Sequence, residues 1–124
     1  MTSSQVVKVL IVDDDIFTRR IYRTMLFHFG FEITEAEDGK KAINHFLDGN
    51  EYDLVLMDKD MPKMNGVEAT RTLRGMGIPV KIIAITGDEN SRGAFLDAGA
   101  DEFLLKPLSF PALTDILKAF NFVN

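Results

Sequence analysis

The chain has 124 residues, enough for one domain with a buried core, and its 46% hydrophobic and 27% charged residues are typical of globular and not disordered proteins. A net charge of -5 without a basic cluster argues against a nucleic-acid surface, and the apolar runs are too short to cross a membrane. The absence of cysteine excludes disulfides and thiolate metal sites, and it is compatible with a cytoplasmic or nuclear protein.

Apolar runs of strand length alternate along the chain with segments that have helical periodicity. Strands are predicted over residues 6–12, 31–35, 53–57, 80–85 and 102–105, and helices over residues 16–29, 40–47, 66–73, 91–98 and 110–120. Five strands alternating with five helices predict a doubly wound α/β domain, in which helices cover both faces of a parallel sheet. Residues 1–5 are expected to form a loose tail, and the domain is expected to span residues 6–121.

Polar residues follow four of the predicted strands, at the sheet edge where ligands of open parallel sheets bind. These residues are Asp13, Asp14, Asp15, Asp58, Thr86 and Lys106. Acidic residues crowded at neighbouring strand ends repel one another unless a cation lies among them. Because the cluster offers oxygen ligands and no His or Cys, the sequence predicts a Mg²⁺ site.

Each of these residues alone has an ordinary structural explanation. An acidic run before a helix is often an N-cap, residues 58–66 resemble a polar turn, and Thr86 could lead into a helix. Lys106 alone could be a surface lysine. Their joint placement favours a functional site, whereas His28 and His45 are expected to be ordinary residues on the faces of helices.

Taken in order, these residues resemble the receiver domain of two-component response regulators, over about residues 6–120. The resemblance rests on the pair Asp13-Asp14, on Asp58 within the stretch MDKDMPKMNG, on Thr86 and on Lys106-Pro107. It implies the flavodoxin-like strand order 2-1-3-4-5. The stretch M-D-K-x-M-P is similar to that of plant stand-alone receivers.

The resemblance also implies a chemistry. Asp58 would be the phosphoacceptor, a nucleophile toward a phosphohistidine donor. The Mg²⁺ ligands would be Asp13, Asp14, Asp58 and the backbone carbonyl of Asp60. Lys106 and Thr86 would bind the phosphoryl oxygens. Such a chain is not an enzyme in the ordinary sense, because it would catalyse only its own phosphorylation and dephosphorylation.

Further roles follow from the resemblance alone. Phe103 would be an aromatic switch residue that turns inward when Thr86 is drawn to the phosphoryl group. Pro107 would take the cis peptide bond that the family commonly uses to orient its lysine. Asp60 and Asp88 lie at the two positions that tune the lifetime of the phosphorylated state.

The implied partner is a histidine kinase or a histidine phosphotransfer protein, which related receivers contact at the beginning of the first helix, here residues 16–20. Phe17 is a candidate apolar contact there, although a partly buried core position is the favoured interpretation. No output domain follows Phe120, so we expect a monomer whose output is a protein contact or the removal of phosphate from a relay.

Two alternatives remain open. A haloacid-dehalogenase-like phosphohydrolase also uses an Asp nucleophile, a second Asp two residues later, a Thr or Ser, a Lys and Mg²⁺. Against it, the D-x-D pattern follows the third predicted strand and not the first, and the chain has no room for a cap domain. The other alternative is an unphosphorylated pseudo-receiver that serves as a binding module.

Overall fold

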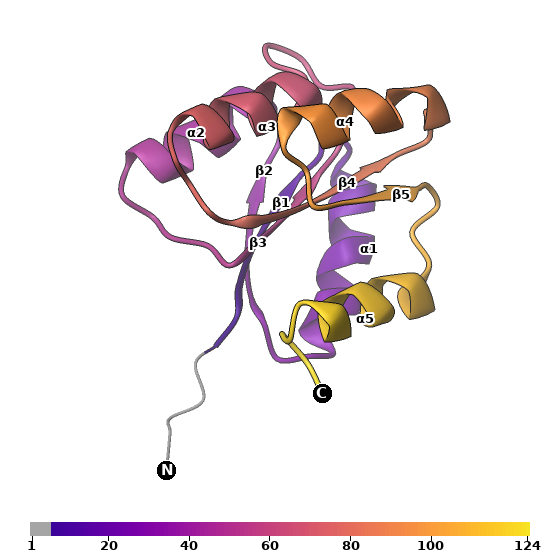
Figure 1. The fold of residues 1–124 in the computed structure, drawn as a ribbon. Helices are drawn as coiled ribbons and strands as arrows, with labels where there is room; N and C mark the ends of the chain where they lie inside the picture. Colours follow the sequence, from indigo (N-terminus) through magenta and orange to yellow (C-terminus); the bar gives the residue numbers. More distant parts are fainter. Residues whose placement is uncertain (1–5) are drawn as a thin grey trace.

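Five parallel strands form the central sheet of the computed structural model, which describes residues 6–124 (Figure 1). The strands are β1 (Lys8–Val12), β2 (Glu32–Ala36), β3 (Leu54–Met57), β4 (Lys81–Thr86) and β5 (Glu102–Leu105). Their order is β2-β1-β3-β4-β5, and all neighbouring pairs are parallel. The predicted fold class and strand order are therefore confirmed. The predicted tail, residues 1–5, lies outside the described residues.

Helices cover both faces of this sheet. They are α1 (Ile16–Phe27), α2 (Gly39–Leu47), α3 (Gly66–Gly75), α4 (Arg92–Ala98) and α5 (Phe110–Ala119), with the short 3-10 helix η1 (Glu89–Ser91) before α4. In Figure 1, α2, α3 and α4 lie on one side of the sheet, and α1 and α5 lie on the other. Within residues 6–124, no helix has the length and apolar character needed to cross a membrane.

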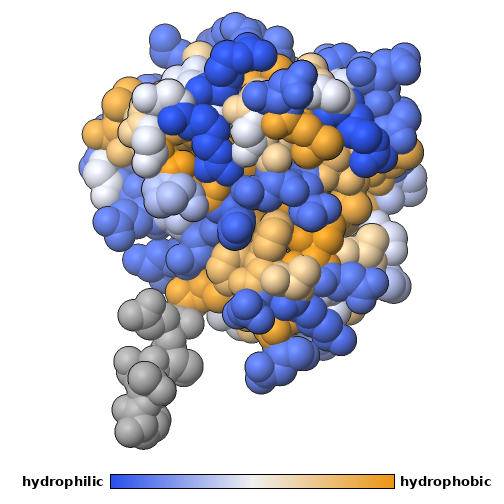
Figure 2. Space-filling view, in the orientation of Figure 1, coloured by the Kyte–Doolittle hydropathy of each residue, from blue (hydrophilic) through white to orange (hydrophobic). Residues whose placement is uncertain are grey.

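The side chains of β1 alternate between two hydrophobic clusters, one on each face of the sheet. Leu10 and Val12 pack into the cluster that α2, α3 and α4 cover, whereas Val9 and Ile11 pack into the cluster beneath α1 and α5. All four side chains are at most 1% exposed. Burial on both faces explains why the central strands β1, β3 and β4 are continuous apolar runs, whereas the edge strand β2 is less buried and carries Glu32, Thr34 and Glu35. In Figure 2, hydrophobic residues also gather on the surface, between α4 and α5.

Side-chain caps fix where four of the helices begin. The capping residues are Asp15, Asp38, Asn65 and Ser109, each of which accepts a hydrogen bond from a backbone N–H in the first turn. The helix α1 ends at Phe27, two residues before the predicted end. The backbone N–H groups of Phe29 and Gly30 donate to carbonyls three residues back, and Gly30 has a φ of 76°, so the chain turns there toward β2.

The start of α3 lies unusually close to the end of β3. A Cβ atom placed on Gly66 would lie 1.8 Å from the backbone oxygen of Asp58, so only glycine fits at this position. The Gly66 N–H also donates to the backbone oxygen of Lys59 at 2.8 Å. This contact folds the loop between β3 and α3 back against the strand end.

Replacing Gly66 with alanine should therefore destabilise the domain by about 3 kcal/mol, because the new methyl group collides with backbone that cannot move independently. The matched control is Gly93→Ala in α4, where an added Cβ has no neighbour within 4 Å. That substitution should raise stability by about 1 kcal/mol through helix propensity. Urea denaturation of both variants measures the difference, and equal stabilities would contradict the close approach at Gly66.

Candidate functional site

The carboxyl ends of β1 and β3 bring three acidic side chains together. Asp13 and Asp58 directly follow these strands and are only 1% and 7% exposed, whereas Asp14 is exposed. One carboxylate oxygen from each of the three lies within 4.8 Å of the others. These donors are hard oxygen ligands without a nitrogen or sulfur ligand among them, and this donor set fits Mg²⁺.

Lys106 bridges the two buried acids from the end of β5. Its Nζ lies 3.0 Å from Oδ2 of Asp13 and 3.1 Å from Oδ1 of Asp58. The backbone N–H of Lys106 donates to the carbonyl of Thr86 at 2.9 Å, which ties this residue to the end of β4. The Lys106-Pro107 peptide bond is cis, the isomer that the resemblance implies.

Burial and mutual charge perturb the acids and the lysine. Burial, together with the charge of Asp13, raises the pKa of Asp58 to about 6, although Lys106 opposes the rise. Burial lowers the pKa of Lys106, but its hydrogen bond to Asp13 and the charge of Asp58 outweigh this effect and raise it overall. Three carboxylates face one ammonium group, and their excess negative charge favours a divalent cation.

Thr86 and Asp88 border the cluster at the end of β4. Thr86 is 3% exposed, and its Oγ1 accepts a hydrogen bond from the Asp88 N–H at 3.3 Å. The Asp88 carboxylate pairs with Nζ of Lys59 at 2.7 Å, and this hydrogen bond raises the pKa of Lys59. The Asp60 side chain is 82% exposed and lies 3.8 Å from the same ammonium group. No role was predicted for Lys59, which links the loops after β3 and β4.

Residues 9–118 match the family model described as the response regulator receiver domain. The chain belongs to this family. It is 43% identical over 121 residues to the two-component response regulator ORR41 of Oryza sativa subsp. japonica, covering 94% of this chain and 95% of that protein. It is 40% identical over 115 residues to two-component response regulator 24 of Arabidopsis thaliana, covering 91% and 83%.

The fold is similar to a crystal structure of the response regulator TrrA of Thermotoga maritima in complex with Mg²⁺-BeF. The TM-score is 0.83 at 33% identity, and the match covers 92% of this chain and 98% of that one. The resemblance to receiver domains, including those of plants, is thus confirmed. Membership of the receiver family argues against the phosphohydrolase alternative.

Phe103 of this receiver domain is already buried, at 6% exposed, in the strand β5. Its ring lies 6.1 Å from that of Phe95, and the guanidinium group of Arg92 lies 4.6 Å from its centroid. The ring is therefore covered by two residues of α4. Its predicted rotation stays a prediction.

The prediction that Phe17 is a partly buried core residue is wrong. Phe17 is 70% exposed, and Ile16 and Ile21 on the same helix are 44% and 56% exposed. The inward face of α1 is formed by Tyr22 and Leu26. The spacing of apolar residues could not identify this face, because apolar residues also lie on the exposed side of the helix. The receiver domain thus presents an apolar surface at the beginning of α1, directly after the acidic cluster.

His28 and His45, expected to be ordinary helix residues, take no part in the acidic cluster. His28 is exposed at the end of α1, where its ring lies edge-on to those of Phe29 and Phe110. His45 lies in the last turn of α2, where its ring is edge-on to that of Tyr52.

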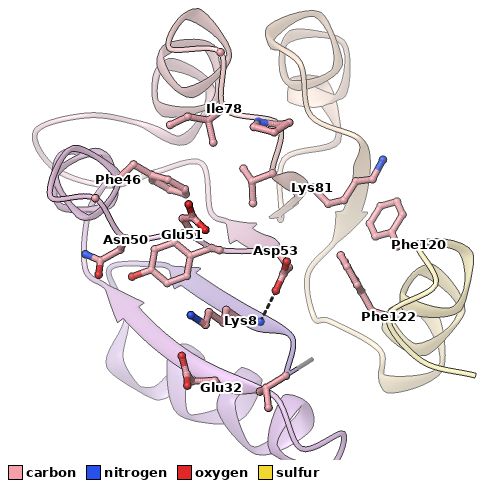
Figure 3. A pocket seen from close by; sticks show the side chains of 16 residues that line it. Lys8, Glu32, Phe46, Asn50, Glu51, Asp53, Ile78, Lys81, Phe120 and Phe122 are labelled. Carbon is pink, nitrogen blue, oxygen red and sulfur yellow. Dashed lines mark hydrogen bonds between the residues drawn. The ribbon is translucent and has the colours of Figure 1, made fainter. Parts of the chain in front are cut away.

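A separate cavity of about 1130 Å³ lies at the amino ends of the strands, away from the acidic cluster (Figure 3). Lys8 lines it from β1, Asp53 from the position before β3 and Lys81 from β4, and the Lys8 N–H donates to Asp53 at 2.8 Å. Phe120 and Phe122 close one side, with Lys81 5.2 Å from the Phe120 ring. Its acids and lysines alternate in charge, unlike the three carboxylates at the carboxyl ends of the strands.

The raised pKa of Asp58 predicts a pH-dependent stability without metal. The folded protein holds a proton on Asp58 up to about pH 6, whereas the unfolded chain loses it near its ordinary value of 3.8. Stability therefore falls as the pH rises through this window, by up to about 3 kcal/mol. In EDTA, Asp58→Asn should be more stable than the wild type at about pH 8 and similar to it at about pH 4.

The matched control is Asp60→Asn, since this side chain on the same loop is exposed and should alter stability little at either pH. Denaturant midpoints across the pH range measure the effect. A stability gain for Asp58→Asn that does not vary with pH would contradict the assigned titration.

Proposed function

We propose that Asp58 accepts a phosphoryl group from the phosphohistidine of a histidine kinase or a histidine phosphotransfer protein. The observation that carries this proposal is the buried Asp58 carboxylate, paired with Lys106 inside a cluster of oxygen donors. An Asp58 oxygen attacks phosphorus, the bond between phosphorus and the donor imidazole breaks, and Asp58 becomes an acyl phosphate.

The neighbouring residues serve this transfer by neutralising charge. Asp13, Asp14 and Asp58 would hold Mg²⁺, with the backbone carbonyl of Asp60 as a further ligand. When bound, this ion neutralises the carboxylates and the phosphoryl oxygens. Lys106 already lies between two of the acids and can donate to a phosphoryl oxygen on Asp58. The Mg²⁺-BeF complex of the similar TrrA structure supports a site of this kind.

Phosphorylation then switches a protein-binding surface. A phosphoryl group on Asp58 attracts the Thr86 hydroxyl through a charge-assisted hydrogen bond. Because Thr86 Oγ1 accepts from the Asp88 N–H, its movement is transmitted to the Lys59–Asp88 ion pair and to η1. Phe103, packed beneath Arg92, couples the same change to α4 and β5. Asp60 and Asp88 tune the lifetime of the phosphorylated state.

The donor protein docks on the apolar surface of Ile16, Phe17 and Ile21, which adjoins the acidic cluster. We assign the receiver unit to residues 6–121 and infer a monomer of the cytoplasm or nucleus that binds neither nucleic acid nor membranes. It catalyses only its own phosphorylation and dephosphorylation.

A small phosphodonor with Mg²⁺ should add one phosphoryl group to the wild-type chain, and Asp58→Asn should abolish this addition. Within residues 6–124, the two buried carboxylates that contact Lys106 are those of Asp58 and Asp13, and the Asp13 carboxylate is also engaged by the Asp15 N–H. Intact mass measurement followed by peptide mapping checks both results. The control Asp60→Asn should still be phosphorylated. A wild-type chain that stays unmodified would favour the pseudo-receiver alternative.

Thr86→Ala should accept the phosphoryl group at Asp58 but lose most of the amide chemical-shift changes between Thr86 and Phe103. The nucleophile, acids and lysine survive in this variant, whereas the hydroxyl that responds to the new charge is removed. The measurement is an amide NMR comparison with a beryllofluoride phosphoryl mimic and Mg²⁺. Wild-type shifts throughout that segment would remove Thr86 from the coupling.

Phe17→Ala should slow phosphotransfer from a histidine phosphotransfer protein about tenfold, since a buried aromatic contact contributes on the order of 1–2 kcal/mol at an interface. Its rate with a small phosphodonor should not change. The control is Phe27→Ala at the other end of α1, where the ring is 76% exposed but far along the helix from the acids. Equal effects of the two substitutions on protein-mediated transfer would refute this docking surface.

A further inference from the structure

Arg19 connects the acidic loop to the edge strand β2. From the first turns of α1, its Nη1 donates to the backbone oxygen of Asp13 at 2.7 Å, and its Nε donates to Oε1 of Glu35 at 2.8 Å. The Arg19 side chain is only 12% exposed. The guanidinium group is a charged donor in both hydrogen bonds, and the Glu35 carboxylate is also a charged acceptor. Both bonds are therefore stronger than hydrogen bonds between neutral groups. The guanidinium group therefore holds a backbone carbonyl and a carboxylate in one fixed arrangement.

The carbonyl that Arg19 holds belongs to the peptide that joins Asp13 to Asp14. Asp13 itself is fixed independently, because its N–H donates to Ala36 and its carboxylate accepts from the Asp15 N–H and from Lys106. Asp15 is fixed as the cap of α1. Asp14 differs, since it is exposed and no side-chain hydrogen bond within residues 6–124 involves its carboxylate. Its direction depends on the plane of the peptide before it.

We propose that Arg19 is a positioning residue for the cation site: it fixes the Asp13–Asp14 peptide so that the Asp14 carboxylate faces Asp13 and Asp58 before a cation binds. The inference rests on the proposed Mg²⁺ site and adds to it a residue outside the ligand set. A ligand that is already oriented loses less conformational freedom on binding, so the metal binds more tightly.

The chain supplies a matched control one helical turn later. Arg23 donates through its Nε to the other oxygen of Glu35 at 2.7 Å. Its second hydrogen bond goes to the backbone oxygen of Ile33 and not to Asp13. Arg19 and Arg23 thus share the same carboxylate and the same helix. They differ in the contact to the Asp13 carbonyl on which the inference depends, and Arg23 is the more exposed side chain, at 45% against 12%. Replacing either one costs an ion pair to Glu35, and only replacing Arg19 releases the Asp13 carbonyl.

The test compares wild type, Arg19→Gln and Arg23→Gln by calorimetric titration of the full chain with MgCl₂. Arg19→Gln should raise the Kd for Mg²⁺ about tenfold, in the range seen when outer-shell partners of metal ligands are removed. Arg23→Gln should bind Mg²⁺ like the wild type. Amide hydrogen exchange of the metal-free proteins supplies a second readout: the Asp15 amide, whose N–H donates to Oδ1 of Asp13 at 2.9 Å, should exchange faster in Arg19→Gln alone.

If Arg19→Gln does not fold, the pair Arg19→Lys and Arg23→Lys replaces it. Lysine keeps the charge and the buried stem, but one ammonium group cannot reproduce the planar fork that holds both acceptors. Arg19→Lys should then weaken Mg²⁺ binding and Arg23→Lys should not. Equal affinities, or equal losses, in the Arg19 and Arg23 variants overturn the positioning role. A wild-type chain that does not bind Mg²⁺ refutes instead the metal site on which the inference rests.

Discussion

The contact of one ammonium group with two buried carboxylates is the interaction on which the rest of this receiver domain depends. Asp13 and Asp58 lie almost fully out of solvent and repel each other, and Lys106 contacts both at 3.0 and 3.1 Å. The raised pKa of Asp58 shows that one lysine does not balance the cost of burial and repulsion. The site therefore retains excess negative charge that a divalent cation can neutralise.

Much of the fold serves to hold these groups in place. They come from the ends of β1, β3 and β5, and the parallel register of the buried sheet fixes the distances between those ends. Local contacts then restrain the loops: Asp15 caps α1, and Gly66 lets α3 begin against the backbone of Asp58. Such restraints keep the carboxylates of Asp13 and Asp58 close together although their like charges repel. The apolar surface of Ile16, Phe17 and Ile21, which we propose as the docking surface for a donor protein, begins directly beside them.

The central strands β1, β3 and β4 were predictable because buried parallel strands are short apolar runs, and Asp13 and Asp58 were predictable because they follow two of these runs. The edge strands β2 and β5 are less buried and were predictable from their place in the alternation of strands and helices. The strand order came from the resemblance, since alternating strands and helices allow more than one order. The burial of Phe17 was predicted wrongly because Ile16 and Ile21 are apolar but exposed, so the apolar residues of α1 do not mark a single inward face. Lys59–Asp88 and Arg19–Glu35 join residues 29 and 16 positions apart, and no local pattern identifies such pairs.

Site-resolved carboxyl NMR titration of the whole chain, with and without Mg²⁺, tests this account most directly. In the absence of the metal, Asp58 should titrate near pH 6. With saturating Mg²⁺ its pKa should fall well below that value, because a bound cation favours the ionised carboxylate. A pKa that stays near the ordinary value of 3.8 under both conditions would contradict the claim that the cluster holds unbalanced charge for a cation to neutralise.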